Sequence, residues 1–554
     1  MFDYKKVPVK VQARSGFDKN HFNLFTSKVG RITPILVDEL IPNTTVHLKA
    51  ALTAALPPLA SDTFMRCKLK FAAFFVPHRI IMPGFERWIV RDEAVGNYRI
   101  TTSIMRANTD SLQEPDASAL KARLYPGSLA DFLGCKLTSA SVDALFQANN
   151  SISFSALPFL AYHRIYEDWF RRSLVQKSIY SDSLFTGHLG GTSIKASMSN
   201  VWVPNTKGAA YYTFDPTAVN VAASQSCFYN DGVHLMDFRQ ANFDFDLFTT
   251  ATPEAQDGSA QQVQVDSQSK FTISALRAAN SIQQYLERQN LCGERYVDYV
   301  RGMYGAHLSD GIAQRSVLLG SGDIDVYSKG IYQTNEADSR PSTSNNPFVG
   351  VGTEFGKASI DGQSYLIDNF TAAEHGYLMV VCWLSPRPTY STGISQLLQR
   401  YVSVGSQGNV ANHILQNVGN EPIYQRQVND LKAVVSSNDV FGYQERFYAW
   451  KDMIDEVHGL LRDGQSLESF ACQRTFSAAT GSQINSAFLA IPESYLDQVA
   501  AVEDTISDYG YWCDCFFDYK VSMPLAKYSL PSLQDPAYEH GNTEMMSRGG
   551  TSIA

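Results

Sequence analysis

Residues 511–521 read YWCDCFFDYKV, a stretch in which every second side chain is apolar. Successive side chains of a β-strand point to opposite faces, so this alternation predicts a strand with one buried face. The side chains expected on the buried face are Tyr511, Cys513, Cys515, Phe517, Tyr519 and Val521. Asp514, Asp518 and Lys520 fall on the other face, with Trp512 and Phe516 between them. The stretch therefore favours a mainly β protein.

Two further stretches predict strands. Residues 66–76 alternate as well, with Cys67, Leu69, Phe71, Ala73 and Phe75 on one face, and Pro77 should end the strand. Residues 377–384 are apolar on both faces, which predicts a central strand that is covered twice. If the two alternating stretches belong to one sheet, the long chain between them is built as insertions on that sheet.

Helical patterns lie between the strands. Residues 273–305, ISALRAANSIQQYLERQNLCGERYVDYVRGMYG, predict a helix, a glycine stop and a second short helix. Residues 158–172 predict another helix, capped near Ser155. This helix should bury Tyr162, Ile165 or Tyr166, and Trp169. Polar stretches at 252–269 and 334–347 are typical of exposed loops.

Composition excludes several classes of protein. The 554 residues are 44% hydrophobic, which is ample for a large core, but no apolar run is long enough to cross a bilayer, so we expect no membrane insertion. The eight cysteines are scattered without a CxxC pair, so we expect reduced, buried thiols in a protein assembled in a cytoplasm.

The charge is unevenly distributed. Residues 1–31 carry seven Lys and Arg against two Asp, a net of +5, which leaves −14 for the rest of a chain whose total is −9. One interpretation of this basic segment is a solvated, partly flexible arm. The other is an arm that contacts DNA phosphates, foremost through Lys5, Lys6, Lys10 and Arg14.

No motif predicts catalysis. Glu374 with His375, and His307 with Asp310, lack the spacing of a known catalytic or metal motif. Residues 350–356, GVGTEFG, lack the spacing of a nucleotide loop. We therefore expect no enzyme activity and no cofactor.

Two pairs of carboxylates leave open the alternative of a structural calcium site. They are Asp244 with Asp246 and Asp323 with Asp325, although the ligand series of an EF-hand is missing and ordinary surface acids are the simpler interpretation. A second open alternative concerns a cluster in the predicted helix at 158–172, which could stack on single-stranded bases or could be the exposed face of an amphipathic helix. Its residues are Arg164, Trp169, Phe170, Arg171 and Arg172.

The amino-acid sequences of several segments resemble those of one protein family. LRAANSIQQYLER followed by ERYVDYVRGMYG closely resembles the major capsid proteins of microviruses, especially the gokushovirus-like branch. Further blocks match that family in order, although Asn43 stands where the family usually has glycine. They lie at residues 30–48, 68–89, 128–134, 159–172, 374–390, 441–451 and 517–533.

The resemblance implies a fold and a function. We expect an eight-stranded antiparallel jelly-roll sandwich with long loop and helical insertions, in a single capsid domain over residues 1–554. The basic arm would span 1–31, and the exposed or variable insertions would lie at 173–269 and 334–347. The implied function is that of a bacteriophage major capsid protein, found in the virion, that forms a T=1 icosahedral shell around circular single-stranded DNA.

The resemblance also implies partners, and one alternative function remains. The partners are further copies of the chain, a small basic DNA-packaging protein, a DNA-pilot protein, the single-stranded genome and a host surface receptor. The alternative is a carbohydrate-binding β-sandwich adhesin or tail-fibre-like protein. The 32 Phe and 28 Tyr of the chain would suit the stacking of aromatic rings on sugars in such a protein.

Overall fold

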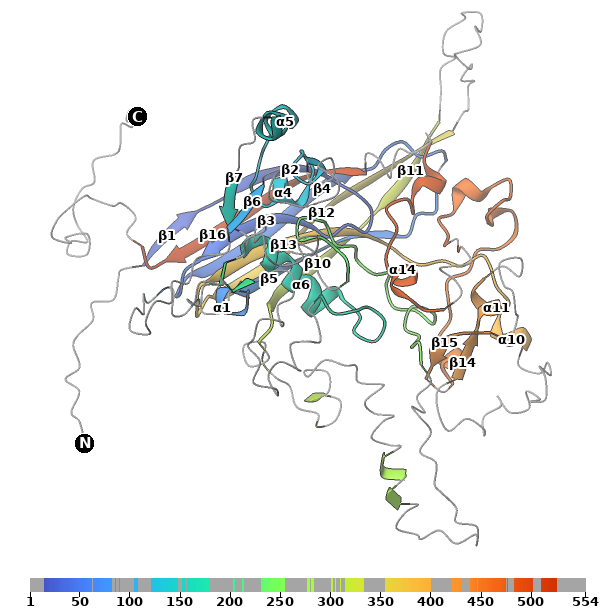
Figure 1. Ribbon diagram of the computed structural model, residues 1–554. Coiled ribbons are helices and arrows are strands. Elements are labelled where there is room, and N and C mark those ends of the chain that lie inside the picture. The colour runs from blue at the N-terminus through green and yellow to red at the C-terminus, as the bar shows by residue number, and fades with distance from the viewer. Residues whose placement is uncertain are drawn as a thin grey trace, which may run out of the picture.

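The structure is a computed structural model in which two antiparallel sheets face each other (Figure 1). It describes residues 14–81 (without 62), 121–179 (without 148–151 and 156), 231–254, 314–332, 354–399, 421–429, 439–501 (without 446, 475 and 477–482) and 510–525. Shorter described pieces lie at 85, 89, 104–107, 203–204, 212–213, 277–278, 280–282, 300–301, 304 and 309.

The larger sheet has six strands. β1 (Ser15–Asp18) and β2 (His21–Ser27) pair with successive parts of β16 (Tyr511–Met523), which pairs in turn with β4 (Thr45–Ala55). Beyond β4 lie β12 (Glu354–Thr371) and, at the far edge, β11 (Tyr327–Tyr332). The first and last described strands of the chain are therefore neighbours.

The smaller sheet has four strands in the order β10, β5, β13, β3. Their bounds are Val317–Asp325, Cys67–Pro77, Gly376–Pro386 and Thr33–Leu40. The inner faces of the two sheets share one apolar core, in which Leu48, Phe71 and Phe517 are completely buried.

The predicted strands are confirmed, including which faces are buried. All six β16 side chains that the sequence places inside are at most 3% exposed. β5 ends at Pro77 as predicted, and β13 is buried on both faces. However, β5 and β16 lie in opposite sheets, which excludes the arrangement in which both share one sheet. Alternation reports which face of a strand is buried, but it carries no information on the partner strand.

The turn between β3 and β4 explains the residue at position 43. Asn43 has a φ of 64°. Glycine adopts this left-handed region at no steric cost, and asparagine is among the few other residues that tolerate it. The Asn43 backbone N–H donates to the carbonyl of Ala372, 2.7 Å away. The turn thus carries the chain from the smaller sheet to the larger one and is bonded to the residue that follows β12.

The predicted helix near residue 158 is confirmed. α6 (Leu157–Ile165) begins where the Ser155 hydroxyl accepts a hydrogen bond from the Leu157 N–H, and it packs against β5 and β13. Tyr162 and Ile165 are buried. The Tyr162 hydroxyl donates to the carbonyl of Ile32 at 2.7 Å. A π-helical turn over Tyr166–Phe170 follows directly.

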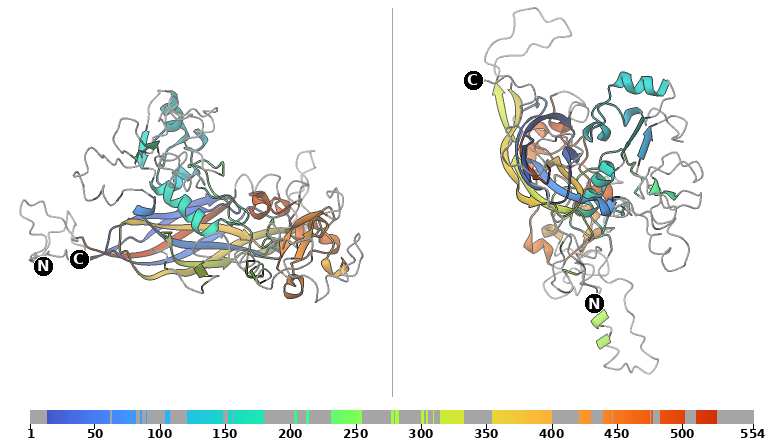
Figure 2. Two further views of the ribbon diagram at one scale, coloured as in Figure 1. Left: turned by 60° about the horizontal axis from the view of Figure 1, so that its bottom comes forward. Right: turned by 90° about the vertical axis from the view of Figure 1, so that its left-hand side faces the viewer.

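A compact set of short elements lies at one end of the sandwich, and we call residues 388–399, 421–429 and 439–490 the end region (Figure 2). It contains α10 (Gln396–Gln399), β14 (Glu421–Tyr424), α11 (Gln425–Val428), β15 (Val440–Gln444), α12 (Tyr448–Lys451) and α14 (Ser486–Leu489). Its small core includes Tyr390, Phe441 and Phe488 and is separate from the core of the sandwich.

Other short elements lie outside the two sheets. They are α1 (His78–Ile81), β6 (Ile104–Ala107), α4 (Leu129–Phe132), α5 (Ser139–Gln147), β7 (Ile152–Ser155), β8 (Val203–Pro204), β9 (Tyr212–Thr213), and single 3₁₀ turns at Gly459–Leu461, Glu468–Phe470 and Asp497–Val499.

Of the two predicted insertions, one is partly described and the other is not described. Within 173–269, residues 231–254 do not form an exposed loop, because Leu235 and Phe243 pack into the sandwich core and Phe248 into the end region. This segment therefore joins the two cores. The stretch 334–347 lies outside the described residues.

The helices predicted within 273–305 are described only at 277–278, 280–282, 300–301 and 304, and all of these residues are helical. Ile282, which the periodicity places on the apolar face, is exposed in the single chain. The rest of that prediction lies outside the described residues.

Candidate functional site

Of the four residues predicted to face nucleic acid, the structure describes one. Lys5, Lys6 and Lys10 lie outside the described residues. Arg14 is described, and its guanidinium donates to the hydroxyl of Thr45 and to the carbonyl of Ser522. Arg14 therefore attaches the start of the chain to β4 and β16.

The remaining cations of the basic segment are engaged in ion pairs. Lys19 lies 2.6 Å from Asp38, and Lys28 and Arg31 lie 3.3 Å and 2.7 Å from Glu493. With residues 15–18 and 21–27 in strands, the part of the predicted arm from residue 14 onward belongs to the sandwich. Only residues 1–13 are left as a candidate free arm.

The three arginines near α6 are structural. Arg164 pairs with Asp168 at 3.0 Å, Arg171 pairs with Glu167 at 2.9 Å, and Arg172 donates to backbone carbonyls of residues 249–251. Arg171 and Glu167 are nearly buried. The prediction of an exposed arginine face is therefore wrong. The acidic residues one turn away draw these side chains onto the protein, which the spacing Glu167–Arg171 could have signalled.

The neighbouring aromatic rings also face inward. Trp169 packs against Phe74, and its indole N–H donates to the Ser316 carbonyl at 3.1 Å. Phe170 lies edge-on to Trp383, with ring centres 4.9 Å apart. Both rings are held against the smaller sheet, so the hypothesis of base stacking on this helix finds no support in the geometry.

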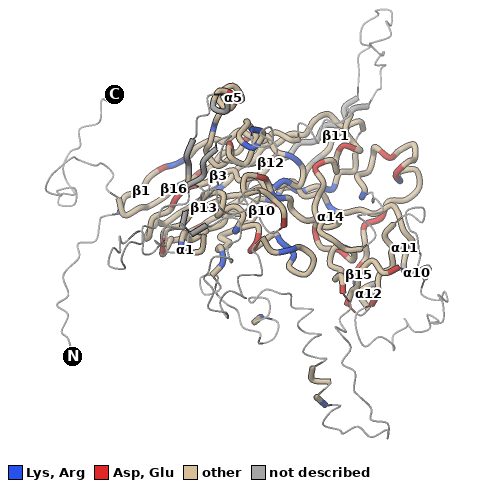
Figure 3. Tube along the Cα trace, in the orientation of Figure 1, with Lys and Arg blue, Asp and Glu red and all other residues tan. Residues whose placement is uncertain are grey.

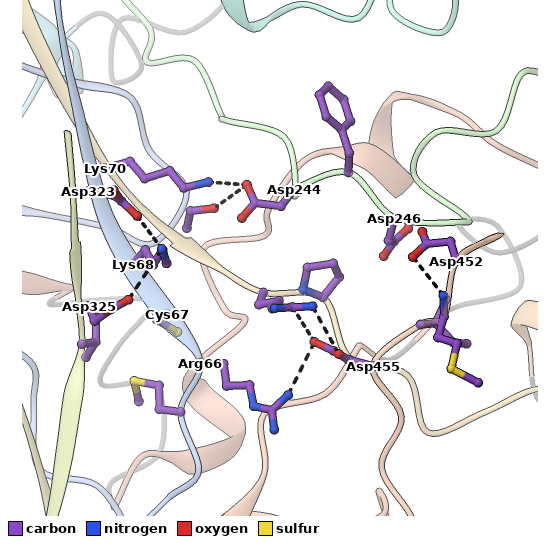
Figure 4. A pocket seen from close by; sticks show the side chains of 18 residues that line it. Arg66, Cys67, Lys68, Lys70, Asp244, Asp246, Asp323, Asp325, Asp452 and Asp455 are labelled. Carbon is purple, nitrogen blue, oxygen red and sulfur yellow. Dashed lines mark hydrogen bonds and ion pairs between the residues drawn. The ribbon is translucent and has the colours of Figure 1, made fainter. Parts of the chain in front are cut away.

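The four carboxylates considered for calcium line one pocket of 630 Å³ between the sandwich and the end region (Figure 4). Lysine side chains lie between them. Lys68 contacts both Asp323 and Asp325, and Lys70 contacts Asp244. Asp246 instead accepts hydrogen bonds from the Tyr390 hydroxyl and from two backbone N–H groups.

Each carboxylate of these two pairs thus already has a partner within the chain. The Lys68 ammonium holds the pKa of Asp323 below its ordinary value, chiefly through their hydrogen bond. Across the described part of the chain, no group of three or more His, Cys, Asp and Glu side chains is arranged to hold a metal ion.

The other residues weighed for chemistry are only partly described. Glu374 pairs with Arg79 at 2.7 Å, and the ring of His375 lies against Phe85. His307 and Asp310 lie outside the described residues, and residues 354–356 of the glycine-containing loop belong to β12. The six described cysteines are free thiols, and burial raises the pKa of Cys382 and of Cys472 to about 12.

Among the described residues, several exposed large apolar side chains lie on the larger sheet and several in the end region. On the outer face of the larger sheet, Phe22 and Phe516 pack together with ring centres 4.8 Å apart, and Leu24 and Trp512 are exposed on the same two strands. Across the end region and the adjacent residue 245, the exposed apolar side chains are Phe245, Leu397, Leu398, Trp450, Met453, Leu460 and Leu467. Exposed apolar patches of this kind mark interaction surfaces.

The end region is also acidic (Figure 3). The Lys and Arg residues in its longest stretch, residues 439–490, are Arg446, Lys451, Arg462 and Arg474. Its acids are Asp439, Glu445, Asp452, Asp455, Glu456, Asp463 and Glu468. A surface of this charge repels nucleic acid phosphates and suits a protein partner. No described helix is long and apolar enough to cross a membrane.

Comparison with known proteins finds the same kind of protein throughout. A family model described as "Capsid protein (F protein)" matches residues 5–533. The capsid protein VP1 of Chlamydia phage 1 is 23% identical over 616 residues, covering 96% of this chain and 97% of that protein. VP1 of Bdellovibrio phage phiMH2K is 22% identical over 564 residues, with coverage of 96% and 97%. VP1 of Spiroplasma virus 4 is 23% identical over 582 residues, with coverage of 94% and 95%.

Proposed function

The chain belongs to the phage capsid protein (F protein) family, and on that premise we propose that copies of it assemble into a closed T=1 icosahedral shell around circular single-stranded DNA. The observation that carries the proposal is the match over nearly the whole length, because it includes both the sandwich and the end region. The chain then acts through association, with no chemical step. It is found in the virion after assembly in the host cytoplasm.

The sandwich is an eight-stranded jelly roll in this proposal, with β1 and β2 counted as one interrupted strand and β11 as an addition. The strand pairing supports it. In chain order, the first of the eight strands pairs with the eighth, the second with the seventh, the third with the sixth and the fourth with the fifth. A jelly roll, which is one long antiparallel hairpin wound into two sheets, requires this nested pairing.

Contacts between copies cover exposed apolar side chains of the end region. Met453 is 93% exposed and Leu398 70% exposed in the single chain. Burying one such side chain is worth about 1.5–3 kcal/mol, so a neighbouring copy gains stability by covering several of them. In a closed shell with symmetry, every copy makes the same contacts.

Residues 1–13 contact the packaged DNA in this proposal. Lys5, Lys6 and Lys10 lie within 13 residues that precede Arg14, which is attached at the edge of the larger sheet. Contacts from lysine to phosphate are independent of base sequence and weaken as salt rises.

The acidic chain also implies partners for packaging. A net charge of −9 on each copy adds to the charge of the genome, so cations must be supplied from elsewhere. We assign this role to a small basic DNA-packaging protein, and we expect a DNA-pilot protein and a host surface receptor to complete the set of partners.

Velocity sedimentation of the purified full-length protein, followed by electron microscopy of each fraction, tests the proposal. Closed particles of one size are expected, because shell contacts close on themselves. A discrete small oligomer that binds glycans, with no particles at any concentration or with added DNA, would overturn the proposal in favour of an adhesin.

A further inference from the structure

Two histidines and a glutamate lie at one corner of the smaller sheet, on the end of β3 (Glu39), the start of α1 (His78) and the turn between β12 and β13 (His375). The His78 Nε2–H donates to Oε1 of Glu39 at 3.1 Å. The backbone N–H of His78 donates to the carbonyl of His375 at 3.0 Å. The three residues therefore tie three separate segments together.

The ring of His78 lies in an apolar site. It is 1% exposed, and its ring centre lies 4.6 Å from that of Tyr377 and 5.0 Å from that of Phe85. Its Nδ1 has no hydrogen-bond partner among the described residues. The hydrogen bond to Glu39 is therefore the contact that orients this buried ring.

His375 adds a second titratable ring to the same corner. Its ring centre lies 5.7 Å from that of Phe85, which also contacts His78. Phe85 thus links the two histidine rings, and Glu39 is bonded to the corner through His78.

Among the described residues, arginines on α1 and on the neighbouring α6 form ion pairs of their own. On α1, Arg79 pairs with Glu374 of the turn. Arg164 of α6, which packs on α1, pairs with Asp168. From β13 the titratable group is Tyr377, whose pKa is raised to about 12 chiefly by burial, so it stays neutral over the relevant range.

We propose that Glu39, His78 and His375 form an acid-responsive latch, which holds α1 and the 372–376 turn on the sheet near neutral pH and releases them when the medium is acidified. The proposal concerns the fold of a single copy and does not depend on the proposed function. Acidification would loosen this corner first, while the two sheets remain paired.

The direction follows from two shifts that point the same way. Burial, reinforced by His78, holds the pKa of His375 below its ordinary value of 6.5, and Glu39 opposes this only partly. The hydrogen bond from His78 lowers the pKa of Glu39 below 4.5. A group whose pKa is lower in the folded state stabilises it above the unfolded pKa, and this contribution is lost as the pH falls through the folded pKa. The loss therefore begins below 6.5 for His375 and continues below 4.5 for Glu39.

Hydrogen exchange by mass spectrometry on the full-length protein tests the latch. The protection factor, which is the intrinsic exchange rate divided by the observed rate, is measured at several pH values between 7.5 and 5. Peptides covering 76–81 and 372–377 are compared with a peptide of β16 over 511–517. We expect the protection of the corner to fall about threefold or more across this range, with no change in β16. Protection of the corner that is independent of pH would overturn the proposal.

Variants separate the latch from a general effect of acid. His375→Gln should keep the corner protected down to pH 5, because glutamine cannot take up a proton at this position. His458→Gln, which changes an exposed histidine paired with Glu456, should retain the wild-type response. Glu39→Gln provides an independent check and should lower the protection of the corner already at pH 7. A wild-type pH response in His375→Gln, or full protection at pH 7 in Glu39→Gln, would contradict the latch.

Discussion

The sandwich and the end region are stabilised in different ways. The sandwich has one continuous core built from the inner faces of two sheets, and side chains such as Tyr511 and Phe517 are completely buried there. The end region has a small separate core, short helices and a two-stranded sheet. It also exposes Leu397, Leu398 and Met453. The sandwich thus builds a continuous core within one chain, although its outer face exposes Phe22 and Leu24, whereas the end region combines a small core with exposed apolar side chains.

A buried cation replaces part of the missing apolar core in the end region. The Arg474 guanidinium lies 4.1 Å from the ring centre of Phe488 and 4.2 Å from that of Phe243. It also donates to the Tyr390 hydroxyl at 3.1 Å and to the Phe488 carbonyl. Because Phe243 belongs to the segment that joins the two cores, Arg474 holds the end region to the sandwich by cation–π contacts and hydrogen bonds.

The largest effect is expected in the sandwich. Phe517→Ala should lower the free energy of unfolding by about 3–5 kcal/mol, because it removes a completely buried ring and leaves a cavity between the sheets. Guanidinium denaturation of the unassembled subunit measures this loss. Phe516→Ala is the matched control on the outer face of the same strand. An equal loss from both variants would contradict the assignment of inner and outer faces.

A smaller and local effect is expected from Arg474→Leu. The change removes two hydrogen bonds and leaves the Phe488 carbonyl without its donor, at a cost of about 2–4 kcal/mol. Hydrogen exchange should accelerate in residues 486–490 and remain unchanged in 511–521.

The control for Arg474→Leu is Arg462→Leu, which changes an exposed arginine in the same region. If Arg474→Leu accelerated exchange equally in both stretches, the two regions would be one cooperative unit, and the comparison drawn here would be wrong.

The smallest effect on stability is expected from the basic segment, which belongs to neither region. Replacing Lys5, Lys6 and Lys10 together with Gln should leave the free energy of unfolding unchanged and should lower the DNA content of particles, more strongly as salt rises. Absorbance of purified particles at 260 and 280 nm measures the DNA content. Replacing the exposed lysines Lys451 and Lys520 is the control. If the lysine variant failed to form shells even in the absence of DNA, the segment would instead make contacts between copies.

The two regions also differ in how much the sequence predicts. The alternation of 511–521 predicts which side chains are buried, because a strand with one face in water has a period of two. In 66–76 it predicts the inward side chains, but Ala72, Phe74 and Val76 on the other face are buried as well. It does not predict the partner strand, which depends on contacts between residues far apart in the chain. The jelly roll is what the resemblance to the capsid family implies, because alternation alone does not specify that fold.

Sequence patterns fail where polar side chains are buried. Arg164, Arg171 and Arg172 have the spacing of an exposed helical face, but their partners at Asp168, at Glu167 and on the backbone of residues 249–251 draw them inward. Arg474 is surrounded by rings from distant segments, so no local pattern reveals it. Asn43, which stands where the family usually has glycine, adopts a left-handed backbone with a φ of 64°, a conformation that both residue types tolerate.

The most direct test of the central claim is a cryo-electron microscopy reconstruction of the assembled particle at side-chain resolution. The account predicts a closed T=1 shell in which a neighbouring copy covers Leu397, Leu398 and Met453 of the end region. A particle in which these side chains face solvent would contradict the role given to the end region, and the absence of any closed particle would contradict the proposed shell itself.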